Sequence, residues 1–167
     1  MSPSRRRLAV LGAAAGLALA GCADGPTAEP TAHAAAGGVT VTATLAGPAG
    51  GGRELRITFA PQRPGFHVYS VDLPAGGVDG LGVPTRIAVR GDLAATGGPT
   101  ADRPTHLLQP AGLPTRIPVY PDGPVTFTVP VRQSGHHRAD VVVGYGACSE
   151  NTCLLPVHDE TLQLALD

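Results

Sequence analysis

Two cysteines near the end of the chain are the residues best suited to chemistry. Cys148 and Cys153 lie in the stretch GYGACSENTCLLP, with the four residues SENT between them. A cysteine pair can be a structural disulfide, part of a metal site, or a redox-active disulfide that exchanges with other thiols. Each use implies a different function, so the rest of the sequence must rank them.

The N-terminal residues indicate export from the cytoplasm. Three arginines at 5–7 precede an uncharged apolar stretch, residues 8–20, which is shorter than the roughly 20 residues of a membrane-spanning helix. It leads into Leu19-Ala20-Gly21-Cys22, which resembles the lipobox of bacterial lipoproteins; an ordinary signal peptide with a chance cysteine is the alternative. We expect residues 1–21 to be a signal peptide and Cys22 to carry a lipid that anchors the protein on the extracytoplasmic side of a membrane, periplasmic or at the cell surface.

An extracytoplasmic compartment is oxidising, which bears on the two remaining thiols. If Cys22 is acylated, Cys148 and Cys153 have only each other as partners. Residues directly opposite in a hairpin have Cα atoms about 4.5–5.5 Å apart, within reach of a disulfide. Such a bond closes a ring of only six residues and contributes at most about 2 kcal/mol. A short ring across an existing hairpin favours a redox role over a structural one.

Composition and periodicity predict an all-β domain. The 167 residues include 23 glycines and 17 prolines, which disfavours long helices. No stripe of basic residues is present, so nucleic acid is not an expected partner. Residues 22–38 are small, polar and low in complexity, and we expect a flexible tether there. Alternating apolar residues predict strands at 39–45, 53–60, 66–71, 85–90, 124–131, 138–147 and 160–166.

These short strands predict a two-sheet antiparallel, immunoglobulin-like sandwich over residues 39–167. Residues 91–114 fit no strand pattern and are expected to form a long functional or mobile loop. Gly144 and Gly146 lie on the face of Cys148 when residues are counted by twos. They either leave a bare patch that another backbone can approach, or fit a β-bulge, and the sequence leaves both readings open.

The cysteine hairpin resembles the end of the N-terminal periplasmic domain of the thiol:disulfide interchange protein DsbD family. The matching residues are GYGAC (144–148) and CLLP (153–156), with a weaker match at FHVY (66–69) and PTRI (84–87). The resemblance spans residues 39–167 and implies an immunoglobulin-like fold with a redox-active pair and no other cofactor. It implies an oxidoreductase domain that relays electrons from a membrane thiol reductase or thioredoxin-like donor to exported thiol proteins, as in cytochrome c biogenesis.

The resemblance also suggests roles for individual residues. It implies that Cys153 pairs with partners and that Cys148 resolves the mixed disulfide. Glu150 would oppose thiolate formation, and a protonated His158 nearby would favour it. Four further residues are expected to line the site, namely His67, Tyr69, Tyr145 and Gly146. For the two tyrosines, a place in the core is an equal reading.

The sequence departs from the family pattern in three places. Leu155-Pro156 replaces the usual proline pair, and the family's transmembrane and thioredoxin-like domains are absent from the sequence, so the donor is expected to be a separate protein. Residues 91–118 contain no aromatic residue to shield the cysteines. The residues that would have to do so are His106, Leu107 and Leu108.

Two other functions are compatible with these residues. The first is a lipid-anchored β-sandwich binding module in which the disulfide is structural. The second is a copper site formed by Cys153 and His158 with other histidines, namely His67, His106 or the pair His136 and His137. Met1 is the only methionine and leaves with the signal peptide, so this second function lacks a thioether ligand.

Overall fold

The computed structural model describes residues 28–48, 52–110 and 114–166. The predicted signal peptide, Cys22 and the first residues of the predicted tether lie outside the described residues. The described part contains no helix that could cross a membrane. Its strands are β1 (Thr31–Ala36), β2 (Val39–Ala46), β3 (Arg53–Pro61), β4 (His67–Val68), β5 (Arg86–Gly91), β6 (Leu93–Ala95), β7 (Thr100–Ala101), β8 (His106–Leu108), β9 (Ile117–Val119), β10 (Val125–Gln133), β11 (Arg138–Tyr145), β12 (Ala147–Cys148) and β13 (Val157–Ala165).

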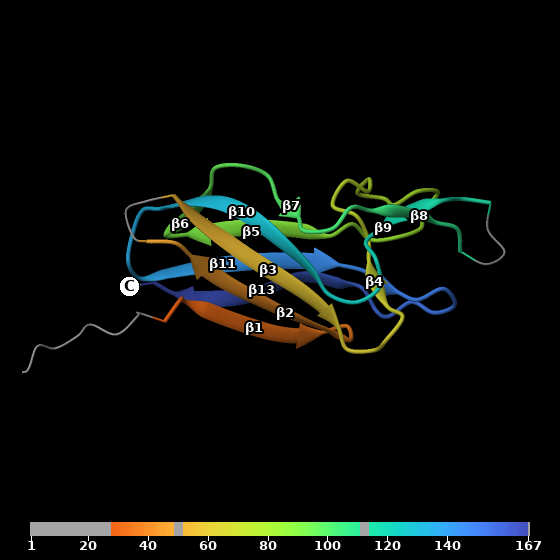
Figure 1. Cartoon of the computed structure of the whole chain (residues 1–167), viewed down its shortest axis with the longest axis horizontal. Helices are drawn as coiled ribbons and strands as arrows, with labels where there is room; N and C mark the ends of the chain where they lie inside the picture. The colour runs from red at the N-terminus through yellow and green to blue at the C-terminus, as the bar shows by residue number, and fades with distance from the viewer. Residues whose placement is uncertain (1–27, 49–51, 111–113, 167) are drawn as a thin grey trace, which may run out of the picture.

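Two antiparallel sheets form the body of the molecule (Figure 1). The larger sheet has the order β1-β2-β3-β10-β6, and β7 also pairs with β10. The smaller sheet has the order β13-β11-β5. Two short ladders, β12-β4 and β8-β9, complete the fold, and the labels of β4, β8 and β9 gather at the end of the molecule away from the C-terminus (Figure 1). The predicted all-β, two-sheet antiparallel sandwich is confirmed.

Side chains that alternate between buried and more exposed along the long strands form the core between the sheets. In β2, β3 and β10 every second side chain is buried, which is the pattern of strands with one face toward a core. The Phe59 ring of β3 packs edge-on against Phe127 of β10 at 5.5 Å and against Tyr145 of β11 at 5.3 Å between centroids. Burying one such side chain stabilises a fold by about 1.5–3 kcal/mol, and the Phe59–Tyr145 pair joins the two sheets.

The predicted tether is wrong for residues 31–38, because the chain there forms strand β1 and its turn. Gly37 and Gly38 have φ of 51° and 71°, and two successive positive φ angles suit a two-residue hairpin turn. This turn folds β1 back onto β2, with Ala34 opposite Val41. Alternate alanines of β1 pack against the core. Alanine and threonine resemble linker composition, and this hid the strand in the sequence.

The segment 91–114 is the second difference from the predicted elements. It contains three short strands instead of one long loop: β6 and β7 pair with β10, and β8 pairs with β9. Two- and three-residue strands are too short to show an alternating pattern. The predicted strand at 66–71 is likewise reduced to β4, followed by a single bridge between Tyr69 and Val119.

Candidate functional site

The cysteine hairpin extends the central strand of the smaller sheet. After β11 the chain enters β12, where Cys148 lies directly opposite His67 of β4. The SENT loop then closes through a backbone hydrogen bond from Ser149 N to Thr152 O of 2.7 Å. The Ser149 hydroxyl also accepts the Thr152 N–H at 3.2 Å. This local bonding fixes the return of the chain and brings the second cysteine back to the first.

Cys148 and Cys153 form a disulfide. Their Cα atoms are 4.0 Å apart, slightly closer than the predicted 4.5–5.5 Å for directly opposed hairpin residues. The two halves differ in exposure: Cys148 is 4% exposed, whereas Cys153 is an exposed residue. An incoming thiolate therefore meets the Cys153 side of the bond first.

Tyr69 lies against the buried half of the disulfide. Its hydroxyl is 2.9 Å from Cys148 Sγ and 3.9 Å from Cys153 Sγ. The backbone of Tyr69 is held by the bridge to Val119 and by the Thr85 hydroxyl, which donates to the Tyr69 carbonyl at 2.6 Å. Burial raises the pKa of Tyr69 above its ordinary value, so the phenol keeps its proton at neutral pH and can donate it to sulfur in a hydrogen bond.

His67 lies two positions before Tyr69 and is buried, with 2% of the residue exposed. Its Nδ1 is 3.0 Å from Asp122 Oδ1, and its Nε2 is buried without a hydrogen-bond partner among the described residues. The His67 and Tyr69 rings are perpendicular, with centroids 6.3 Å apart. Asp122 has no role in the sequence analysis, because it stands in a Pro-Asp-Gly turn that is explained by turn formation alone.

A pocket of about 250 Å³ opens over the disulfide. The hairpin strand β8 and the residues after it contribute Leu108 and Pro110 to its wall. Of the residues predicted to shield the cysteines, Leu108 lines this pocket, whereas His106 and Leu107 are exposed. The remaining lining residues are Tyr69, Cys148, Ser149, Glu150, Asn151, Thr152 and Cys153.

Of the two readings of the glycines, the structure fits the β-bulge and not the bare patch. The β11–β13 register shifts between Val143 and Tyr145, which disrupts the count by twos. Gly146 is buried, and a Cβ placed on it would lie 3.1 Å from both the Tyr69 ring and Val83. Gly146 is thus covered by Tyr69, and its missing side chain lets that ring lie close to β12.

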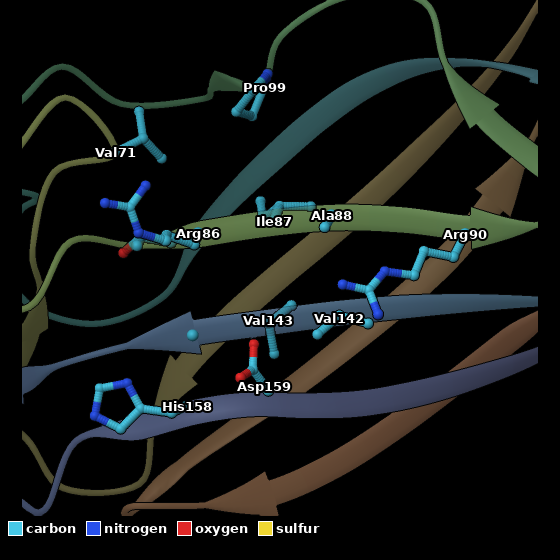
Figure 2. Close-up of a pocket in the computed structure, with 12 residues that line it drawn as sticks. Val71, Arg86, Ile87, Ala88, Arg90, Pro99, Val142, Val143, His158 and Asp159 are labelled. Carbon is cyan, nitrogen blue, oxygen red and sulfur yellow. The ribbon is translucent and has the colours of Figure 1, made fainter. Parts of the chain in front are cut away.

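Two residues expected to line the site lie elsewhere. Tyr145 packs in the core, its hydroxyl donates to Ala36 O at 2.9 Å, and burial raises its pKa to about 12. His158 lines a separate hollow of about 380 Å³ on the smaller sheet. Figure 2 shows His158 on one side of β11 and Arg86 and Arg90 on the other.

The copper alternative has no ligand set in the described part of the chain. No group of three or more histidine, cysteine, aspartate or glutamate residues there is placed to hold a metal ion. His67 is engaged by Asp122, and the two sulfurs are bonded to each other. The arrangement is suited instead to thiol–disulfide exchange at a half-exposed bond.

Comparison with known proteins supports the fold. No family model and no curated protein matches the chain. Among solved structures, the N-terminal periplasmic domain of ScsB from Proteus mirabilis matches with a TM-score of 0.59 and 16% identity, over 83% of this chain and 52% of that one. The chain has the immunoglobulin-like fold of this ScsB domain. It spans about half of the ScsB chain.

The N-terminal domain of Neisseria meningitidis DsbD in its reduced form is also similar. It matches with a TM-score of 0.43 and 16% identity, over 82% of this chain and 83% of that one. The expected fold is confirmed by the ScsB match, which is also an N-terminal periplasmic domain. At this identity the ScsB likeness concerns the fold alone, so the function depends on the geometry around Cys148 and Cys153.

Proposed function

We propose that the protein is an extracytoplasmic thiol–disulfide interchange domain that relays electrons through Cys148 and Cys153. The observation that carries this proposal is the asymmetry of the disulfide. One sulfur belongs to an exposed residue, while the other is buried and lies 2.9 Å from a protonated phenol. The exposed half suits nucleophilic attack, and the buried half suits a leaving group stabilised by a hydrogen bond.

The exchange proceeds in two steps that transfer two electrons. A donor thiolate attacks Cys153 Sγ, a new S–S bond forms, and Cys148 Sγ leaves with the electron pair of the broken bond. The donor's second thiol then attacks the donor sulfur that is bonded to Cys153, and Cys153 leaves as a thiolate. The reduced pair passes the electrons on when Cys153 attacks a client disulfide and Cys148 resolves the product. This division of labour is the one that the DsbD resemblance implies.

The position of the bond also supports a redox role. The cysteines are separated by five positions in sequence, and the strands that carry them are already joined by the hairpin bonds of the SENT loop. A bond that closes so short a loop contributes little to folding. A structural disulfide in a binding module would be expected to join distant parts of the chain.

The partners follow from the same chemistry. The donor is a membrane thiol reductase or a thioredoxin-like protein, and the clients are exported proteins with thiols or disulfides, including those of cytochrome c biogenesis. The ScsB domain is periplasmic, which supports an extracytoplasmic location for this chain.

Trapping of mixed disulfides tests the proposed function. In cells that express Cys148→Ala, an attacked Cys153 has no resolving thiol, so we expect partners to accumulate in covalent complexes that reductant releases. Cys153→Ala should trap far less, because Cys148 is 4% exposed. The double variant Cys148→Ala with Cys153→Ala is the control for complexes unrelated to this pair. The proposal is contradicted if neither single variant traps a partner above this control.

We also propose that Cys22 is the lipid anchor of a mature lipoprotein whose signal peptide is residues 1–21. Because β1 begins at Thr31, the linking segment is residues 22–30 and not the whole of 22–38. Cys22→Ala should release the protein from membranes, since the lipid on this residue is the proposed means of attachment. Membrane retention of Cys22→Ala, measured by fractionation, would contradict the anchor without affecting the redox proposal.

A further inference from the structure

A buried histidine, paired with an exposed aspartate, lies on the strand opposite Cys148. His67 and Cys148 are directly opposite in the β4–β12 ladder, and the side chains of such a pair project to the same face, with Cβ atoms about 4.5–5.5 Å apart. The His67 side chain and the Cys148 sulfur therefore lie on the same face of this ladder. The first step of the proposed exchange places a negative charge on this sulfur.

The two ring nitrogens of His67 have different surroundings. Nδ1 is 3.0 Å from Asp122 Oδ1, whereas Nε2 is buried and has no hydrogen-bond partner among the described residues. A buried polar atom without a partner costs free energy, and such atoms in native proteins often have a functional reason. With Nδ1–H donated to Asp122, Nε2 carries a free lone pair that can accept a proton.

The groups around His67 determine how that proton would be stabilised. The Asp122 carboxylate contacts Nδ1, the Tyr69 ring is perpendicular to the imidazole, and Cys148 is the residue directly opposite His67 on β12. The Asp122 side chain is 59% exposed while that of His67 is 3% exposed, so Asp122 links the buried ring to solvent. Glu150 lies in the SENT loop on the pocket side of the disulfide.

We propose that His67 takes up a proton when Cys148 becomes a thiolate. This inference rests on the proposed function and adds a positioning residue to it. As the S–S bond breaks, Cys148 Sγ keeps the electron pair, and a solvent proton binds Nε2 of His67 while Asp122 holds Nδ1–H. The reduced site then contains a Cys148 thiolate, a His67 imidazolium and the Tyr69 hydroxyl donating to sulfur. Buried opposite charges offset each other, and the thiol pKa of Cys148 falls.

The direct test is the pKa of the Cys148 thiol in a Cys153→Ser background, measured by the ultraviolet absorbance of the thiolate. His67→Asn retains an N–H donor for Asp122 but removes the titrating Nε2, so a merely structural contact is largely preserved. We expect this change to raise the Cys148 pKa by about one unit or more, which is about a tenfold loss of thiolate at a fixed pH below both values. An unchanged Cys148 pKa in a folded His67→Asn variant would overturn the proposal.

Two comparisons make the result specific. His158→Asn, which removes an imidazole from the separate hollow, should leave the Cys148 pKa unchanged; an equal rise in this control would overturn the assignment to His67. In the unmutated domain, an NMR titration should give a higher His67 pKa in the reduced than in the oxidised protein. The same His67 pKa in both states would overturn the proposal even if His67→Asn failed to fold.

This inference and the proposed function fail in different experiments. The thiol pKa and the NMR titration use the isolated domain and need no partner protein. Trapping with Cys148→Ala needs a partner but lacks the thiol that His67 is proposed to influence. A normal set of trapped partners with no effect of His67 would reject only the inference. A clear effect of His67 on the Cys148 pKa with no trapped partner would reject only the relay function.

Discussion

The sandwich body and the cysteine end of this molecule are built in different ways. The body consists of strands of eight or nine residues, such as β2, β3, β10, β11 and β13, whose side chains form one large apolar cluster. The cysteine end consists of strands of two or three residues, β4, β8, β9 and β12. Its small buried cluster contains Tyr69, Leu73, Ile117, Val119 and Cys148.

This difference separates stability from reactivity. The disulfide is packed in the small cluster and not among the aromatic rings between the sheets. Opening and closing the S–S bond therefore changes contacts at one end of the molecule, where short ladders can adjust without disturbing the long ones. The same separation predicts that substitutions in the two regions affect different measurements.

The largest effect on stability is expected from Phe127→Ala in the body. Phe127 is fully buried and contacts the rings of Phe59 and Tyr120, so its truncation should lower the free energy of unfolding by about 3–5 kcal/mol. Denaturant titration of the purified domain measures this. In the fraction that remains folded, the reduction potential of the disulfide should be unchanged. A large shift in potential would show that the two regions are coupled.

Removal of the disulfide should have a smaller effect. Cys148→Ala with Cys153→Ala opens a six-residue ring, which costs at most about 2 kcal/mol by loop entropy, and the body keeps its core. We expect a cooperative unfolding transition in the same denaturant titration, at a stability well above that of Phe127→Ala. Unfolding of the double variant, or of the reduced wild type, at room temperature would mean that the disulfide is structural.

Tyr145, which lies in the sandwich body, should make the free energy of unfolding depend on pH. Burial raises its pKa to about 12 in the folded state, above the unfolded value of about 10. The folded state therefore favours the neutral phenol; this contribution is fully present below about pH 10 and is lost as the pH rises toward 12. Tyr145→Phe should lose the hydrogen bond to Ala36 O, at about 1 kcal/mol near neutral pH.

Between about pH 10 and 12 the stability of the wild type should consequently fall more steeply than that of Tyr145→Phe. Tyr120→Phe is a suitable comparison, since burial also raises the pKa of Tyr120 and its ring packs against Phe127 of β10. Parallel pH profiles for the wild type and Tyr145→Phe would contradict the assignment to Tyr145.

The smallest effect on stability is expected at Leu155, near the cysteines. Leu155 is 85% exposed and Leu107 is 61% exposed, and the two lie in the segments that flank the disulfide pocket. Leu155→Ser should change the free energy of unfolding by no more than about 0.5 kcal/mol. It should slow oxidation or reduction by a protein partner, because exposed apolar side chains favour docking, but leave the rate with dithiothreitol unchanged. Equal slowing with both reagents would argue against a docking role.

The same contrast explains what the sequence could predict. The long strands of the body were predictable because seven or more alternating residues give a clear period of two. The hairpin and its disulfide were predictable because the SENT loop and the two cysteines are local in sequence. The all-β sandwich followed from these strands, and the short edge strand β1 was missed because its alanines resemble a linker.

The site around the disulfide was only partly predictable. Tyr69 was expected near the cysteines, and the structure brings its hydroxyl to Cys148 Sγ. The contact between His67 and Asp122 joins residues 55 positions apart and has no local signature. His158 was expected near the cysteines but lines a separate hollow on the smaller sheet, because its position depends on how β13 pairs with β11.

The reduction potential of the Cys148–Cys153 pair is the most direct test of the proposed relay. Equilibration of the purified domain with a dithiothreitol or glutathione couple gives this value. We predict a potential above about −300 mV, within reach of thioredoxin-like partners, because structural disulfides of secreted proteins typically lie below that value. A potential well below about −300 mV would contradict the relay and leave a binding module with a structural disulfide as the better account.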